Sequence, residues 1–128
     1  MVLRSWRFLL KRVTLLRWPD GSNSRRTPCT FPIAVYEAVV GVARRLNVTI
    51  RTAETSLDRF LMSARVRVVP ITAEMGRAAL SAFDPYGRGR HPAALNMGDC
   101  FAYACARQLD LPLLFKGEDF PLTDITIA

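Results

Sequence analysis

Residues 98–115 read GDCFAYACARQLDLPLLF, and this stretch decides which kind of fold the chain can adopt. Small and aromatic apolar residues from Gly98 to Leu109 predict a helix. The short apolar run at 111–115, with a proline near its start, predicts a buried strand. A helix followed closely by a buried strand is typical of α/β layer folds.

The same alternation of helix and strand recurs upstream of this stretch. A proline in the first turn and apolar residues three and four apart predict a helix over residues 32–46. Similar spacing predicts helices over 49–64 and 72–86, the second of them beginning at a threonine that suits an N-cap. Between those two, alternating β-branched residues at 66–69 predict a short strand that ends at Pro70. We therefore expect an α/β fold with a mainly parallel sheet flanked by helices and its chemistry in the loops after the strands.

The basic charge of the chain is concentrated at its start. Its 128 residues fit one packed domain, and residues 1–30 hold seven cations and one acid, so +6 of the formal net charge of +7 belongs to them. We expect an atypical N-terminal segment over 1–28, either disordered or a peripheral helix, and a domain over 29–128. A basic amphipathic helix at 4–18 would suit a membrane surface or a phosphate backbone.

Cysteine usage and hydropathy favour a soluble, cytoplasmic protein. Three cysteines, Cys29, Cys100 and Cys105, form no C-x-x-C pair and are too few for a disulfide framework. No apolar run reaches the roughly 18 to 20 residues that cross a bilayer. We therefore expect a reducing compartment and no membrane partner.

The only histidine, His91, lies in the glycine-rich basic run from Gly87 to Pro92, which predicts a loop. A solvated loop histidine is the favoured interpretation, because no partner pattern for a histidine-dependent nucleophile surrounds it. A zinc site with the cysteines lacks the ligand spacing of such sites. Arg88 and Arg90 in this run suit contact with phosphate, although a solvated surface loop explains them equally well.

Three carboxylates stand in three separate predicted elements. Glu37 and Asp99 lie in almost wholly apolar helical stretches, where an unpaired carboxylate is costly, and Asp119 follows the buried strand. Together they could converge on a hard divalent metal ion. Each also has a structural explanation: Asp99 caps its helix, Glu37 pairs with Arg44 or Arg107, and Asp119 is a turn residue.

Several linked motifs resemble the PIN-domain toxin ribonucleases of the VapC type. LNMGDCFAYA at 95–104, LPLLFKGEDF at 111–120 and TDI at 123–125 resemble the C-terminal half of that family. PIAVYEA at 32–38 looks like the family's helix after its second strand. The resemblance runs over about 28–127 without large gaps.

The resemblance implies a compact three-layer PIN-like fold whose acids gather around one or two Mg²⁺ or Mn²⁺ ions. Carried over by motif, Glu37, Asp99 and Asp119 are the metal-binding and catalytic acids, and Asn96 supports the site through hydrogen bonds. Metal and acids would activate a water for attack on an RNA phosphodiester.

The resemblance also implies partners. It predicts an RNA substrate, a homodimer, and a cognate antitoxin that covers the acidic pocket and keeps the toxin silent. Arg88, Arg90 and Lys116 are candidate contacts to RNA phosphates.

The match departs from the family at its beginning. The family opens with a short apolar strand that ends in Asp and forms the centre of the sheet, whereas residues 1–29 contain no such motif and only one acid, Asp20. We interpret this opening as a replaced or misread start, with the central strand missing. Two functions therefore remain open: a metal-dependent endoribonuclease toxin, and a catalytically silent fragment that keeps only an antitoxin-binding or self-association surface.

Overall fold

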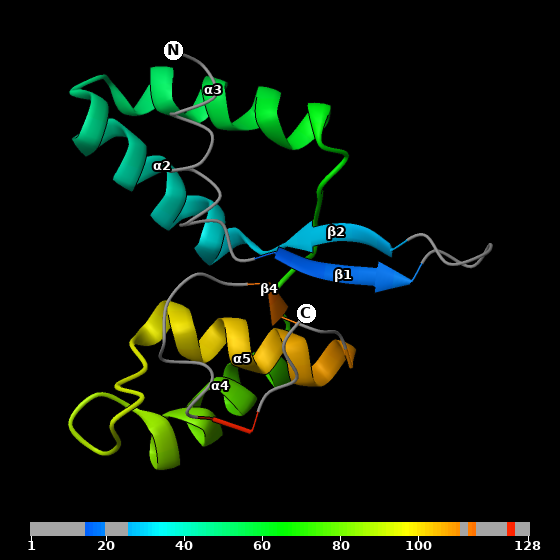
Figure 1. Ribbon diagram of the computed structural model, residues 1–128, viewed down its shortest axis with the longest axis vertical. Coiled ribbons are helices and arrows are strands. Elements are labelled where there is room, and N and C mark those ends of the chain that lie inside the picture. The colour runs from blue at the N-terminus through cyan, green and yellow to red at the C-terminus, as the bar shows by residue number, and fades with distance from the viewer. Residues whose placement is uncertain (1–14, 20–25, 111–112, 115–122, 125–128) are drawn as a thin grey trace.

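The computed structural model describes residues 15–19, 26–110, 113–114 and 123–124. Helices lie on both sides of a small sheet, with α2 and α3 on one side and α4 and α5 on the other (Figure 1). The elements in chain order are β1 (Leu15–Pro19), β2 (Arg26–Thr30), α2 (Pro32–Leu46), α3 (Ile50–Ser63), β3 (Arg67–Val68), α4 (Ala73–Tyr86), α5 (Met97–Leu109) and β4 (Leu113–Leu114).

The helices lie where the apolar spacing predicted them, to within a residue at each end. Side-chain caps fix three of the starts. Thr49 accepts a hydrogen bond from the amide of Thr52, and Thr72 accepts one from Met75. Asn96 caps α5 in the same way. Each cap satisfies an amide that has no partner within the helix, so the sequence sets these boundaries locally.

The sheet has the strand order β3-β2-β1-β4. The expected α/β class is confirmed, and β2 and β3 are parallel, joined through α2 and α3. The expectation of a mainly parallel sheet needs correction, because β1 is antiparallel to both β2 and β4. Only residues 20–25 separate β1 from β2, too few for the crossover that a parallel pair requires.

Strand β1 corrects the interpretation of the N-terminal segment. Residues 15–18 were expected at the end of an amphipathic helix, but they pair inside the sheet, with Leu16 opposite Cys29 on one side and Leu113 on the other. The expected domain boundary at residue 28 falls inside β2. Residues 1–14 and 20–25 lie outside the described part, so the predicted state of those residues remains an expectation.

Two clusters of buried residues hold the layers together. One joins the end of β2 and the start of α2 to α4 and α5, and its members include Phe31, Leu95 and the apolar face of α5. The other lies between α2 and α3 and includes Val42 and Leu57. Because α2 contributes to both clusters, its first turns lie against α5 while its later turns pack on α3.

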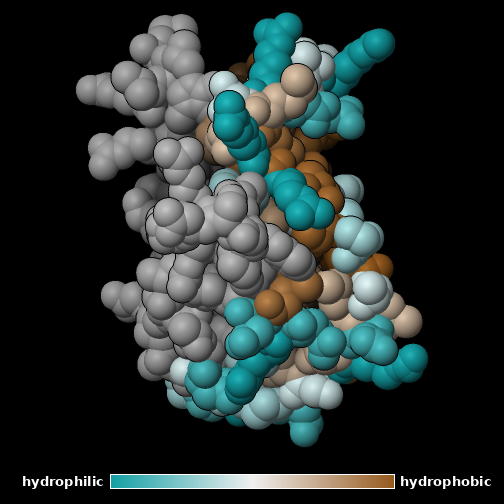
Figure 2. All heavy atoms as spheres, turned by 90° about the vertical axis from the view of Figure 1, so that its right-hand side faces the viewer, coloured by the Kyte–Doolittle hydropathy of each residue, from teal (hydrophilic) through white to brown (hydrophobic). Residues whose placement is uncertain are grey.

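The surface shows where the layers meet solvent. On the face seen in Figure 2, apolar side chains form a band between more polar surfaces above and below it. Strand β3 is at the edge of the sheet, and both of its residues, Arg67 and Val68, are exposed. A charged residue on an edge strand discourages further strand pairing. Within the described ranges, no helix is long and apolar enough to cross a membrane.

Candidate active site

The carboxyl group of Glu37 lies against Gly98, in the first turn of α5. A Cβ atom built on Gly98 would stand 2.7 Å from Cδ of Glu37 and 2.9 Å from its Oε2. Only a residue without a side chain leaves this space to the carboxylate. The contact places Glu37 beside the chain neighbour of Asp99, at the positive end of the α5 dipole, where a carboxylate is favoured.

Asp99 takes part in a capping box at the same helix end. Oδ1 of Asn96 accepts a hydrogen bond from the amide of Asp99 at 2.9 Å, and Oδ2 of Asp99 accepts one from the amide of Asn96 at 3.1 Å. Asp99 therefore caps its helix, which was the structural explanation for this acid in the sequence analysis. The cap also fixes the orientation of this half-buried carboxylate next to the Glu37 contact.

A closed loop carries the chain from α4 to this helix end. Gly87 and Leu95 form a parallel bridge, and the amide of Leu95 donates to the carbonyl of Tyr86 at 3.0 Å. Inside the loop, Nδ1 of His91 accepts a hydrogen bond from the amide of Ala93 at 3.0 Å. The His91 ring stands edge-on to Tyr86, with 5.1 Å between centroids. His91 is thus half-buried and internally bonded rather than simply solvated.

The basic residues predicted to contact RNA have different surroundings. Arg90 bonds Asp84, with 2.8 Å between Nη2 and Oδ1, and its Nε donates to the carbonyl of Asp84. Arg88 is exposed, and it is not part of the Arg90–Asp84 or the Arg107–Asp124 ion pair. Its amide donates to the carbonyl of Leu95, the residue before the α5 cap. Lys116 lies outside the described residues.

Sequence reasoning gave no role to a network on the next turns of α5. The hydroxyl of Tyr103 donates to Asp124, and Arg107 donates to both Asp124 and Tyr103. The hydrogen bond from Tyr103 and the positive charge of Arg107 lower the pKa of Asp124. Burial, and then the bond to Asp124, raise the pKa of Tyr103. The spacing of Asp99, Tyr103 and Arg107, four residues apart, was a signal for this shared face.

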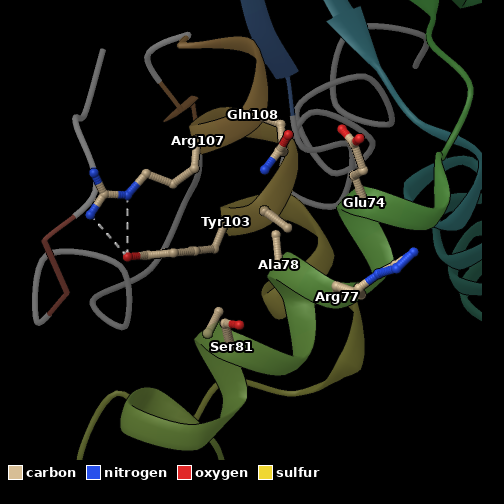
Figure 3. Close-up of a pocket in the computed structure, with 9 residues that line it drawn as sticks. Glu74, Arg77, Ala78, Ser81, Tyr103, Arg107 and Gln108 are labelled. Atoms are coloured by element: carbon tan, nitrogen blue, oxygen red, sulfur yellow. Dashed lines mark hydrogen bonds between the residues drawn. The ribbon is translucent and has the colours of Figure 1, made fainter.

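A hollow of about 500 Å³ lies between α4 and α5. Figure 3 shows Arg107 reaching to the hydroxyl of Tyr103, while the side chain of Arg77 on α4 points away from Tyr103. Neither Glu37 nor Asp99 is among its lining residues, so this hollow is separate from the acid pair.

The three cysteines are free and buried, as small core residues. Burial, reinforced by nearby Cys29, raises the pKa of Cys105 to about 11, and Sγ of Cys105 contacts Sδ of Met75 at 3.8 Å. Burial and the negative charge of Asp99 raise the pKa of Cys100. These protonated thiols are poor nucleophiles and poor metal ligands.

The donor chemistry of the site suits a hard cation. Glu37 of α2 contacts Gly98, and Asp99 follows Gly98 on α5. Mg²⁺ is typically held by one or two carboxylates together with waters. The described residues contain no group of three or more histidines, cysteines or acids that could hold a metal ion. Asp119, the third predicted ligand, lies outside them. The two carboxylates that the structure describes are of the chemical kind that hard divalent cations bind.

The chain is an α/β domain in which a carboxylate of α2 contacts the first turn of α5. The PIN domain family model matches residues 13–125. The VapC ribonuclease of Rhizobium meliloti is 39% identical over 108 residues, which cover 76% of each chain. Ribonuclease VapC30 of Mycobacterium tuberculosis is 52% identical over 73 residues, 56% of each chain.

A ribonuclease VapC of Mycolicibacterium smegmatis is also 52% identical, over 69 residues and 54% of each chain. The matched part thus spans little more than half the length of these mycobacterial relatives. The chain belongs to the PIN-domain family, and within it to the VapC group. This confirms the resemblance seen in the sequence motifs and the PIN-like α/β fold that it implied.

Proposed function

We propose that this chain is a divalent-metal-dependent endoribonuclease, the toxin of a toxin–antitoxin module. One observation carries the proposal: the carboxylate of Glu37 rests on Gly98, beside Asp99. Two carboxylates held at one helix end repel each other, and a shared cation offsets that repulsion. The names of the VapC relatives, which call them ribonucleases, support the same activity.

In this proposal Glu37 and Asp99 would hold Mg²⁺ or Mn²⁺, and their carboxylates would orient a water toward the phosphodiester. When bound, such an ion would lower the pKa of a water and offset charge on the phosphate oxygens. Asn96 is a positioning residue, because its bond to the amide of Asp99 holds the first turn of α5 in place. Gly98 is the second positioning residue, because it leaves room for Glu37.

We include Asp119 as the third metal-binding and catalytic acid. It precedes Asp124 by five residues, and five residues of extended chain span at most roughly 18 Å. Asp124 in turn contacts Tyr103, one helical turn beyond Asp99. The covalent chain is therefore compatible with delivery of Asp119 to the acid pair.

We propose that Arg88 and Lys116 contact phosphates of the RNA and that Arg90 contributes less to this contact. Arg90 forms an ion pair with Asp84, which reduces its attraction for phosphate. The backbone of Arg88 is bonded to Leu95, next to the start of α5. Guanidinium groups bind phosphate oxygens in pairs of hydrogen bonds.

The partners follow from the VapC group. We propose a cognate antitoxin protein that covers the acidic site, a homodimeric toxin, and a cytoplasmic location. We propose no association with a membrane.

The second candidate function is a catalytically silent fragment that acts only by binding an antitoxin or another copy of itself. The observation in its favour is that residues 1–29 lack the family's motif of an apolar strand ending in aspartate. The only acid in these residues is Asp20. Loss of one carboxylate weakens the negative charge that holds the ion.

A calorimetric Mn²⁺ titration separates the two candidates. Asp99→Asn keeps an oxygen that accepts the bond from the Asn96 amide but removes the charge, so the helix cap and the fold should survive. Saturable Mn²⁺ binding that is lost in Asp99→Asn and in Glu37→Gln, with metal-dependent cleavage of a fluorescent RNA, is the expected result. No Mn²⁺ binding by the wild-type chain would establish the silent fragment instead.

A further inference from the structure

Two large apolar side chains flank the acid pair and project into solvent. Tyr36 is 70% exposed and Met97 is 66% exposed. Each is the chain neighbour of a residue in the Glu37–Gly98 contact, Tyr36 on α2 and Met97 on α5. The two exposed side chains therefore stand beside the same site from opposite helices.

The helical geometry of α2 explains why Tyr36 faces solvent at this place. Successive residues are separated by about 100° around a helix. The fully buried Ala38 lies on one side of Glu37 and Tyr36 on the other, so the ring lies on the solvent side of the carboxylate. Within the described part of the chain, neither the Tyr36 hydroxyl and ring nor the Met97 thioether makes a side-chain hydrogen bond or a ring contact.

We propose that Tyr36 and Met97 form a subsite for one unpaired nucleobase of the RNA, next to the phosphate that is cleaved. The inference rests on the proposed ribonuclease function and adds to it the two side chains that hold one base beside the acid pair. Aromatic rings stack on exposed bases, whereas bases inside a duplex are stacked on one another and out of reach. The thioether of Met97 is polarizable and adapts to the opposite face or edge of the base.

The charges around the subsite favour RNA as its occupant. Arg88 lies exposed near the start of α5, and its amide bonds the carbonyl of Leu95, two residues before Met97. An exposed arginine whose backbone bonds the residue before the α5 cap and an exposed aromatic ring on α2 provide the two kinds of group that bind the phosphates and the bases of a single strand. Glu37 and Asp99 would repel the phosphate unless a cation is shared between them. With that cation bound, the reacting phosphate would lie at the two acids, and the adjoining base would lie at Tyr36.

The test measures binding without cleavage. All variants are made in the Asp99→Asn chain with EDTA present, which removes one acid and prevents hydrolysis. A short fluorescein-labelled RNA without self-complementarity is titrated by anisotropy, alone and annealed to its complement. Tyr36→Phe keeps the ring, Tyr36→Leu keeps apolar bulk without it, and Leu80→Ala is the control, because Leu80 is 72% exposed on α4.

We expect Tyr36→Leu to weaken binding of the unpaired RNA by about 5- to 150-fold, the range that corresponds to one base stacked on an aromatic ring. Tyr36→Phe and Leu80→Ala should stay within about twofold of the parent, and duplex binding should not depend on Tyr36. Circular dichroism should show that each variant is folded, because both side chains are exposed.

Three outcomes would overturn the subsite. They are an unchanged affinity in Tyr36→Leu, an equal loss for unpaired and duplex RNA, and no binding of unpaired RNA by the parent chain. A change in sedimentation of Tyr36→Leu with unchanged RNA affinity would make the surface a contact between copies of this chain. The Mn²⁺ titration is a separate measurement, so failure of the proposed function and failure of the subsite are distinguishable.

Discussion

The carboxylate of Glu37 fills the space that a side chain at Gly98 would occupy. The far end of a flexible side chain can move aside, so Gly98→Ala should fold. The displaced carboxylate would leave the α5 terminus, however. We expect Gly98→Ala to change the free energy of unfolding by less than about 1 kcal/mol and to lower Mn²⁺ affinity and RNA cleavage at least tenfold. Urea unfolding, calorimetry and a cleavage assay measure these quantities.

Gly76 provides the matched control for this substitution. It also lies in a helix, α4, and a Cβ there would meet no atom within 4 Å. Gly76→Ala should stabilise the fold by about 0.5 to 1 kcal/mol and leave metal affinity and cleavage unchanged. Equal metal affinity in the two variants would show that the Glu37 position does not matter for the ion.

Asn96 and its cap give a second prediction. Asn96→Ala removes the oxygen that accepts the Asp99 amide, so the free energy of unfolding should fall by about 1 kcal/mol. Asn96→Ser replaces the amide oxygen with a hydroxyl that also accepts a hydrogen bond, so it should keep most of the stability that alanine loses. Urea denaturation of the three proteins makes the comparison, and identical midpoints would contradict the capping role.

The sequence predicted the parts of this fold that are determined locally. Helices α4 and α5 were recognised because their apolar spacing and caps are encoded within a few residues of each start, as Thr72 and Asn96 illustrate. Strand β1 was missed because LLRWP has no regular alternation, and its strand conformation comes from pairing with β2 and β4.

The candidate site shows the same division. Motif resemblance selected Glu37 and Asp99, but no pattern in the sequence indicated that Glu37 rests on Gly98, because that contact depends on how α2 packs against α5. The bond between Tyr103 and Asp124 was missed for the same reason. Tertiary packing, rather than local propensity, sets both relationships.

The Tyr103–Asp124 bond predicts a pH dependence of stability. The pKa of Asp124 in the folded state is below its usual value, chiefly because Tyr103 donates to the carboxylate. A group with a lowered pKa contributes stability above its unfolded pKa, about 3.9, and loses that contribution as the pH falls through the folded value. The wild-type chain should therefore lose stability below about pH 4 more steeply than Asp124→Asn.

Thermal melting at a series of pH values from neutral to acid measures this difference. Tyr103→Phe removes the donor and is the matched partner of Asp124→Asn, because it keeps the ring in the core. Parallel curves for the wild type and both variants would exclude a contribution from this bond.

His91 provides a prediction for the loop that leads to the site. His91→Ala removes the acceptor of the Ala93 amide and the ring beside Tyr86, so the loop should lose order and RNA cleavage should fall. His91→Asn places an oxygen where Nδ1 stands and should recover activity relative to alanine. Hydrogen exchange of residues 87–95, together with a cleavage assay, separates loss of loop order from loss of chemistry, and equal exchange in all three chains would refute the loop-ordering role.

Thr30 offers a prediction about the core at the end of β2. Its side chain is fully buried, and its hydroxyl finds no hydrogen-bond partner within the described structure. A buried polar group without a partner costs about 1 to 3 kcal/mol, and valine has nearly the same shape without the hydroxyl. Thr30→Val should therefore raise the free energy of unfolding by about 1 kcal/mol, whereas Thr30→Ala should lower it by leaving a cavity. A urea midpoint for Thr30→Val below that of the wild type would mean that the hydroxyl stabilises the fold.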